Sequence, residues 1–191
     1  MITQRLREET KSNHQFTEEV GKSKEIISRK LTLDEYIWLI SKQYLIHKKL
    51  ECQLGKISEI VNNTELDFNS RKKEKFFIKD MELLGLDFKG LNEPGIEFKI
   101  TNLNEALGAM YVMEGSTLGG TVILETLKRN ENLKHISEFN YYGCYGEEVR
   151  TKWKKFQDTL IAYSDTKQKE NEIVEFAKKT FDYYTEVFQM N

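Results

Sequence analysis

Apolar residues recur every three or four positions through most of this chain, which is the spacing of one face of an α-helix. Segments of strictly alternating residues are scarce, and Pro94 is the only proline. Residues 86–101 and 130–146 interrupt the pattern with glycine and polar residues, so we expect connectors there, the second with a short turn. The pattern predicts an all-α fold whose helices cover approximately residues 3–20, 32–61, 70–84, 102–128, 147–163 and 167–188.

Several predicted helix ends carry recognisable signals. Thr32 and Glu35 have the spacing of a capping box, and Glu105 likewise follows Asn102 by three residues. Gly85 follows the third helix, where a left-handed residue commonly ends one. The predicted buried face of the first helix includes Leu6, Phe16 and Val20.

Length and composition indicate one globular domain over residues 1–191, with 39% hydrophobic and 31% charged residues and no repeat or long linker. The net charge of −2 predicts no nucleic-acid or anionic-membrane partner. Cys52 and Cys144 belong to no CxxC pattern, which argues against a zinc site and for a reducing compartment. The N-terminus is polar and no apolar run is long enough to span a membrane. We therefore expect a cytoplasmic protein.

The most unusual segment is residues 114–120, where three glycines interrupt an apolar helical run. Each glycine costs about 1 kcal/mol relative to alanine inside a helix. Gly115 and Gly119 share one helix face, and Gly120 removes a further side chain beside them. One interpretation is close helix packing or a kink. The other is a surface without Cβ atoms against a planar ligand, with the Ser116 hydroxyl beside it.

The second candidate feature is His14 and its helix face. Arg7 lies two turns before His14 on the same stripe, and Glu18 lies one turn after it. A carboxylate at that spacing can bind one imidazole nitrogen and leave the other for a metal. Arg7, with Lys11 nearby, would place positive charge about 10 Å away along the helix. The alternative is a solvent-facing charged stripe. No Glu-x-x-His pair occurs, which argues against a di-iron bundle.

Taken together, these segments resemble the heme oxygenase family, particularly its compact bacterial members. Residues 6–14 (LREETKSNH) are similar to the family's first helix with its proximal heme ligand. Residues 108–120 (GAMYVMEGSTLGG) are similar to its distal helix, and residues 41–48 (SKQYLIHK) to a segment of bacterial members. The resemblance implies a single-domain helical bundle with heme b between a proximal N-terminal helix and a Gly-kinked distal helix.

The resemblance also implies roles for individual residues. His14 would be the axial iron ligand and Glu18 its hydrogen-bond partner. The distal backbone would cross the heme face at Gly115 and Gly119, with further clearance at Gly120. The candidate partners of the heme propionates are Arg7, Lys11, Tyr111 and Lys154. The candidates for ordering distal water are Gln43, His47 and Ser116.

Two positions depart from the pattern of many family members. Arg7 stands where many members have lysine, which keeps the charge but changes the donor geometry. Ser116 stands where mammalian-type members carry a catalytic aspartate, although bacterial relatives also have serine there. For His47 a satisfied buried side chain is the competing interpretation. We expect His135 to be exposed, and the connector to pack onto the bundle through Tyr141, Tyr142 and Tyr145.

The implied activity uses heme as both substrate and cofactor and opens its ring with O2 to biliverdin, carbon monoxide and ferrous iron. The electrons would come from a ferredoxin, a flavodoxin or an NAD(P)H reductase. One alternative is a heme-binding, storage or sensor protein of the same fold without turnover. A thiaminase-like hydrolase is another, but it needs a cysteine nucleophile beside a carboxylate, and neither Cys52 nor Cys144 has a recognisable setting.

Overall fold

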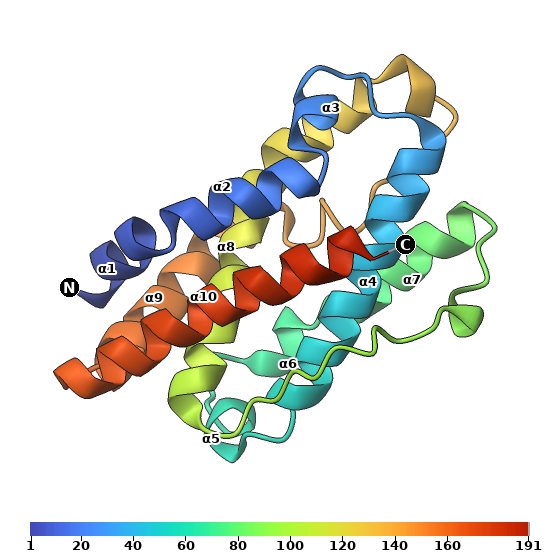
Figure 1. The fold of residues 1–191 in the computed structure, drawn as a ribbon. Coiled ribbons are helices and arrows are strands. Elements are labelled where there is room, and N and C mark those ends of the chain that lie inside the picture. Colours follow the sequence, from blue (N-terminus) through green and yellow to red (C-terminus); the bar gives the residue numbers. More distant parts are fainter. Residues whose placement is uncertain (191) are drawn as a thin grey trace.

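Three long helices form the centre of the computed structural model, which describes residues 1–190 (Figure 1). They are α4 (Leu33–Leu54), α8 (Leu103–Lys128) and α10 (Lys167–Gln189), and α10 packs along α8 and against α4. The shorter helices are α1 (Ile2–Glu9), α2 (Lys11–Val20), α3 (Ser23–Ile27), α5 (Ser58–Val61), α6 (Phe68–Arg71), α7 (Glu74–Leu83) and α9 (Val149–Tyr163). Single turns of 3-10 helix cover Phe88–Gly90, Glu131–Leu133 and Gly146–Glu148. The predicted all-α fold is confirmed.

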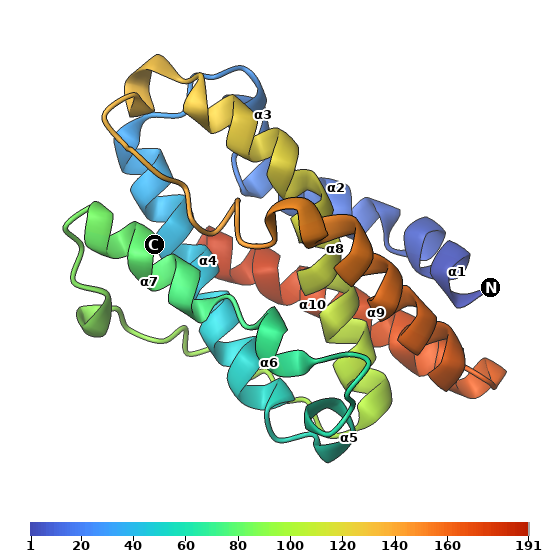
Figure 2. The same ribbon diagram turned by 180° about the vertical axis from the view of Figure 1, so that it is seen from behind.

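The remaining helices surround this centre. Helices α1 and α2 follow one another along α10, while α9 lies against α1 and α8 (Figures 1 and 2). Helix α3 packs on the C-terminal part of α8, and α7 packs on α4. Over residues 1–190, no helix combines the length and the apolar character needed to cross a membrane.

The predicted end signals are present. The Thr32 hydroxyl accepts a hydrogen bond from the Glu35 amide at 3.2 Å, and the Glu35 carboxylate accepts one from the Thr32 amide at 3.0 Å. The Asn102 side chain caps α8 by accepting from the Glu105 amide at 3.0 Å. Gly85 has a φ of 67°, the left-handed conformation expected just after a helix.

The first predicted helix is divided at Thr10. The Thr10 hydroxyl donates to the carbonyl of Leu6 at 2.7 Å, and the backbone there (φ −103°, ψ 4°) leaves the helical region. The expectation that Phe16 is buried was wrong, because its side chain is 51% exposed. No side chain of α2 is fully buried, although Val20 packs partly buried against the hydrophobic core.

Two other predicted helices are also shorter than expected. The second ends at Leu54, before Gly55, and its expected last turn is the separate helix α5. The third is divided into α6 and α7 around Lys73. The Lys73 amide donates to the Glu51 carboxylate at 2.7 Å, so a buried side chain takes the place of a helical carbonyl. Such long-range partners are not visible in a local sequence pattern.

Helix α8 is continuous through the glycine segment, but its ribbon changes direction there (Figure 2). The Ser116 hydroxyl donates to the Met113 carbonyl at 2.8 Å, and the Thr117 hydroxyl donates to the Glu114 carbonyl at 2.6 Å. Such bonds from a side chain to the preceding turn favour bending, as do weak helix formers.

Candidate functional site

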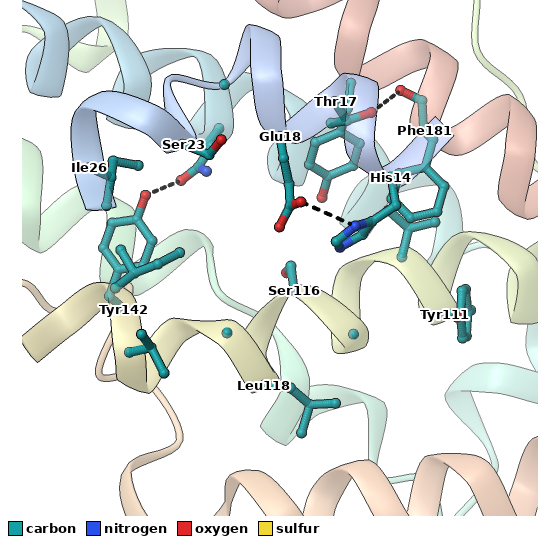
Figure 3. A pocket seen from close by; sticks show the side chains of 18 of the residues that line it. His14, Thr17, Glu18, Ser23, Ile26, Tyr111, Ser116, Leu118, Tyr142 and Phe181 are labelled. Carbon is teal, nitrogen blue, oxygen red and sulfur yellow. Dashed lines mark hydrogen bonds and ion pairs between the residues drawn. The ribbon is translucent and has the colours of Figure 1, made fainter. Parts of the chain in front are cut away.

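A cavity of about 790 Å³ lies between α2 and α8. His14 lines it from α2, and Gly115, Ser116 and Gly119 line it from α8. In Figure 3, His14 and Ser116 extend toward the same space from opposite helices. Small-molecule and cofactor sites commonly enclose about 300–1,000 Å³, so the cavity has the size of a ligand site. The structure thus brings together the two features singled out in the sequence.

On the α2 side, neighbouring side chains fix the orientation of the His14 ring. Its Nδ1 atom lies 3.4 Å from Glu18 Oε2, as the one-turn spacing predicts (Figure 3). The edge of the ring meets Phe181 of α10, with centroids 5.6 Å apart and an angle of 84° between the planes. Since Nδ1 faces the carboxylate, Nε2 is the nitrogen available to bind a metal.

Hydrogen bonds attach α2 to α10. The Asn13 amide donates to Asp182 at 2.8 Å. The Thr17 hydroxyl lies 3.3 Å from the Phe181 carbonyl and 3.0 Å from the Thr185 hydroxyl. These polar contacts add to the packing of the partly buried Val20 and of the His14 ring on Phe181.

On the α8 side, the glycines leave the backbone bare. A Cβ atom added at Gly119 would meet nothing within 4 Å, and one added at Gly115 would meet only the Trp153 ring, at 3.7 Å. Helix packing therefore does not require glycine at either position. It does at Gly108, where an added Cβ would lie 2.6 Å from the Ile173 carbonyl oxygen of α10. Close packing thus explains Gly108, which lies outside the segment singled out in the sequence, and the bare-surface interpretation fits Gly115 and Gly119.

Gly120, expected to give further clearance, is placed differently from Gly115 and Gly119. It lies outside the cavity lining, and an added Cβ would lie 3.2 Å from the carbonyl oxygen of Tyr142. The glycine therefore allows the connector to approach α8.

One end of the cavity carries positive charge. Arg7 and Tyr111 line it there together with Trp153, whose ring centroid is 5.9 Å from that of Tyr111. Burial raises the pKa of Tyr111, while a hydrogen bond with Thr10 and the charge of Arg7 oppose that rise. Tyr111, which the charge of Arg7 reaches, lies across the cavity from the apolar Ile26 (Figure 3).

The two lysines predicted for this end do not line the cavity. The Lys154 ammonium binds Asp158, one turn along α9, at 2.8 Å, and its side chain is 74% exposed. Lys11 is an exposed residue of α2. Helical spacing gives the face of a side chain only approximately, and neither lysine belongs to the face that lines the cavity.

Gln43 lines the cavity from α4, whereas His47, one turn further, does not. The Tyr142 hydroxyl donates to Gln43 Oε1 at 3.3 Å, and Tyr142 itself reaches the cavity from the connector (Figure 3). Burial raises the pKa of Tyr142, so its hydroxyl stays protonated at neutral pH.

His47 is completely buried behind this lining. Its Nε2 atom lies 3.3 Å from the Tyr141 hydroxyl and 3.2 Å from the Tyr184 hydroxyl. Of these two tyrosines, Tyr184 lines the cavity. Burial lowers the pKa of His47, which keeps the ring neutral. His47 is therefore a buried, partnered residue, one side chain away from the cavity.

The expected packing of the connector tyrosines and the expected exposure of His135 are confirmed. Tyr141, Tyr142 and Tyr145 are buried and pack the connector onto the bundle, and His135 is exposed.

Directly before the glycines, Glu114 forms a buried ionic cluster that sequence reasoning missed. Its carboxylate binds the Arg71 guanidinium, the Lys73 ammonium at 2.8 Å and the Tyr145 hydroxyl at 2.9 Å. Burial alone would raise the pKa of Glu114, but the charges of Lys73 and Arg71 outweigh it and lower that pKa. Burial likewise disfavours charge on Lys73, but Glu114 outweighs it and raises the pKa of the ammonium. The cluster holds α8 against the α6–α7 junction immediately beside the cavity.

Over residues 1–190, no three His, Cys, Asp or Glu side chains come together as a metal site. A single histidine facing a large, mostly apolar cavity fits a metal whose other ligands come from a macrocycle. The neighbouring Glu18, the bare glycine face and the positive Arg7 end fit the same group, a flat iron complex with anionic substituents.

A comparison with protein-family models agrees with this geometry. A family model described as heme oxygenase matches residues 1–90 and 95–190. No curated protein matches the chain significantly in sequence.

Two solved structures share the fold. The NO- and CO-bound heme oxygenase from Neisseria meningitidis is 20% identical, with a TM-score of 0.70 over 99% of this chain and 90% of that one. Heme oxygenase-1 from the cyanobacterium Synechocystis sp. PCC6803, solved in complex with heme, is 16% identical, with a TM-score of 0.76 over 98% of this chain and 90% of that one. Because the family model spans nearly the whole chain, this protein belongs to the heme oxygenase family.

Proposed function

We propose that this protein is a heme oxygenase that opens heme b with O2 and external electrons to biliverdin, carbon monoxide and ferrous iron. One observation carries the proposal: a histidine oriented by Glu18 faces, across a cavity of about 790 Å³, a helix surface made bare by Gly115 and Gly119. The solved relative from Synechocystis was crystallised with heme, which supports the same ligand here.

The residues on the α2 side would bind and orient the heme. His14 Nε2 would bind the iron, and Glu18 would accept a hydrogen bond from Nδ1–H and so fix the tautomer. Arg7 and Tyr111 would bind the propionates at the polar end of the cavity.

The residues on the α8 side would leave room and supply hydrogen bonds. Bound heme would supply both the iron that activates oxygen and the ring that is oxidised. Gly115 and Gly119 would let the backbone approach the ring closely, because neither position has a Cβ atom. The Ser116 hydroxyl hydrogen is used by the Met113 carbonyl, so its oxygen is an acceptor for a water, while the Gln43 amide group supplies donors nearby.

The electrons would come from a separate protein. A ferredoxin, a flavodoxin or an NAD(P)H reductase would meet the requirement, since the chain contains no recognisable flavin, nicotinamide or iron–sulfur motif.

The test is to titrate the apoprotein with hemin and then add a reductant and air while recording the absorption spectrum. We expect a sharp Soret band that then gives way to a bilin spectrum, with carbon monoxide released. A Soret band that persists through reduction in air would instead indicate a non-catalytic heme-binding protein. The hydrogen bond from the Ser116 hydroxyl to the Met113 carbonyl favours that alternative, because the hydroxyl then has no hydrogen to donate to a ligand. Failure to bind hemin specifically would refute both functions.

A further inference from the structure

His47 lies in a buried cluster of polar side chains that the proposed binding of heme does not use. Beside the Tyr141 and Tyr184 hydroxyls at Nε2, the ring has Glu51 Oε1 3.7 Å from its Nδ1 atom. Glu51 is 5% exposed, and the Lys73 amide, at 2.7 Å, and the Glu74 amide, at 3.5 Å, hold its carboxylate in place. Within the described residues, His47 Nδ1 lies within hydrogen-bond distance and geometry of no partner.

The hydrogen-bond donors around His47 outnumber its acceptors, so one of the two neighbouring hydroxyls cannot donate to the ring. A neutral imidazole has one N–H donor and one lone pair. The Glu51 carboxylate oxygen that Nδ1 faces can only accept, so the proton belongs on Nδ1 and the lone pair on Nε2. Two hydroxyls face that single lone pair, at 3.2 and 3.3 Å. Only one of them can donate to it, and the other must direct its hydrogen elsewhere.

The surroundings of the two phenols differ. The Tyr141 ring is stacked on Phe77, with centroids 4.0 Å apart and 23° between the planes, and lies outside the main cavity. Tyr184 belongs to α10 and lines the cavity. A hydroxyl hydrogen released from His47 is therefore useful to a ligand only if it is that of Tyr184.

We propose that His47, Glu51 and Tyr141 hold the Tyr184 hydroxyl as a switchable hydrogen-bond donor to a ligand in the heme cavity. In one arrangement Tyr184 donates to His47 Nε2. When an acceptor occupies the cavity, Tyr141 donates to His47 instead and Tyr184 turns its hydrogen toward that acceptor. Two O–H bonds rotate and no proton leaves its oxygen. The proposal rests on the proposed heme site and adds Tyr184 as a residue that touches the ligand, with the other three as positioning residues.

The first test uses the apoprotein and is independent of heme. We expect nitrogen-15 NMR to show His47 as a neutral ring protonated on Nδ1. A ring protonated on Nε2, or on both nitrogens, would overturn the proposal because the shared lone pair would not exist. This result stands even if hemin does not bind, in which case the proposed function fails separately.

The second test uses protein loaded with hemin and then reduced to the ferrous state, with bound carbon monoxide as the hydrogen-bond acceptor. We expect Tyr184→Phe to raise the C–O stretching frequency, because a hydrogen bond to the bound oxygen atom is lost. Tyr141→Phe should shift it in the same direction, since Tyr184 is then the sole donor left for His47. Tyr183→Phe, a neighbour on α10 that lies outside the cavity and packs on Phe98, is the matched control and should leave the frequency unchanged.

Both key variants keep the aromatic ring, and thermal unfolding checks that each has folded. A Tyr184→Phe frequency equal to that of the unaltered protein would overturn the role of Tyr184. A Tyr141→Phe frequency equal to that of the control would overturn the coupling between the two hydroxyls.

Discussion

The two helices that enclose the cavity are attached to the protein in very different ways. Helix α2, which presents His14, has no fully buried side chain and binds α10 through polar contacts of Asn13 and Thr17. Helix α8 buries an apolar stripe, packs closely on α10 at Gly108, and carries the buried ionic cluster of Glu114. Local stability follows buried contacts. The comparison indicates that α8 is held more firmly than α2, and on the proposed function α2 would gain stability from the bound ligand.

The largest loss of folding stability is expected from Glu114→Gln in the firmly held helix α8. Removing one charge of a buried ion pair leaves Arg71 and Lys73 uncompensated, which typically costs about 3–5 kcal/mol. Denaturant unfolding of the apoprotein measures this loss. The exposed pair of Lys154 with Asp158 offers the control Asp158→Asn, which should cost no more than about 1 kcal/mol.

The same cluster predicts a pH dependence. The folded pKa of Glu114 is lowered, so its contribution is present above the unfolded value of about 4.3 and is lost as pH falls through the folded value. Acid unfolding curves of the unaltered protein should therefore be steeper below about pH 4 than those of Glu114→Gln. Parallel curves would show that the carboxylate does not stabilise α8 through its charge.

The next effect concerns α2 directly. In the apoprotein we expect the amides of α2 to exchange with solvent much faster than those of the α8 interior. Hemin at about 100 times its dissociation constant adds up to about 2.7 kcal/mol to the stability of the bound form, so exchange in α2 should slow by up to about 100-fold. Hydrogen-exchange mass spectrometry measures both states. Equal protection of the α2 and α8 amides from exchange in the apoprotein would show that the two helices are held equally firmly.

A pair of glycine variants separates packing from ligand clearance within α8. Gly108→Ala should destabilise the apoprotein by about 1–3 kcal/mol, because the added methyl group meets a backbone oxygen at 2.6 Å. Gly119→Ala should stabilise it by about 1 kcal/mol, since the methyl group meets nothing within 4 Å, and should weaken hemin binding. Unfolding and hemin titration of both variants test this. Unchanged hemin affinity in Gly119→Ala would remove Gly119 from the site.

The smallest effect is expected from Glu18→Gln, on the loosely held side. Loss of a hydrogen-bond partner of a metal-binding histidine typically costs about 10–100-fold in affinity. Because Glu18 is 55% exposed, we expect an effect at the low end of this range, a loss of about tenfold in hemin affinity. The control is Glu19→Gln on the same helix, where the side chain is 60% exposed and binds Lys24. Equal affinities for the two variants would show that Glu18 does not orient His14.

The sequence predicted the helices, the contact between His14 and Glu18, and the glycine face because these depend on spacing within one helix. It predicted neither the burial of Glu114 nor the division of a helix at Lys73, since both depend on partners more than twenty residues away. Trp153, Tyr142 and Tyr184 reach the cavity from three other segments, and their aromatic character was the only local signal. Phe16 was misplaced because helical periodicity alone does not show that a neighbouring element covers a face.

The central claim is that the loosely held helix supplies the iron ligand, and hemin titration of His14→Ala tests it most directly. We expect the sharp Soret band to be lost and the affinity to fall by more than about 100-fold, beyond the usual effect of a hydrogen-bond partner of the ligand. Added imidazole should restore the band, and His135→Ala, which changes an exposed histidine of the connector, should bind hemin normally. A His14→Ala protein with the spectrum and affinity of the unaltered protein would contradict the account.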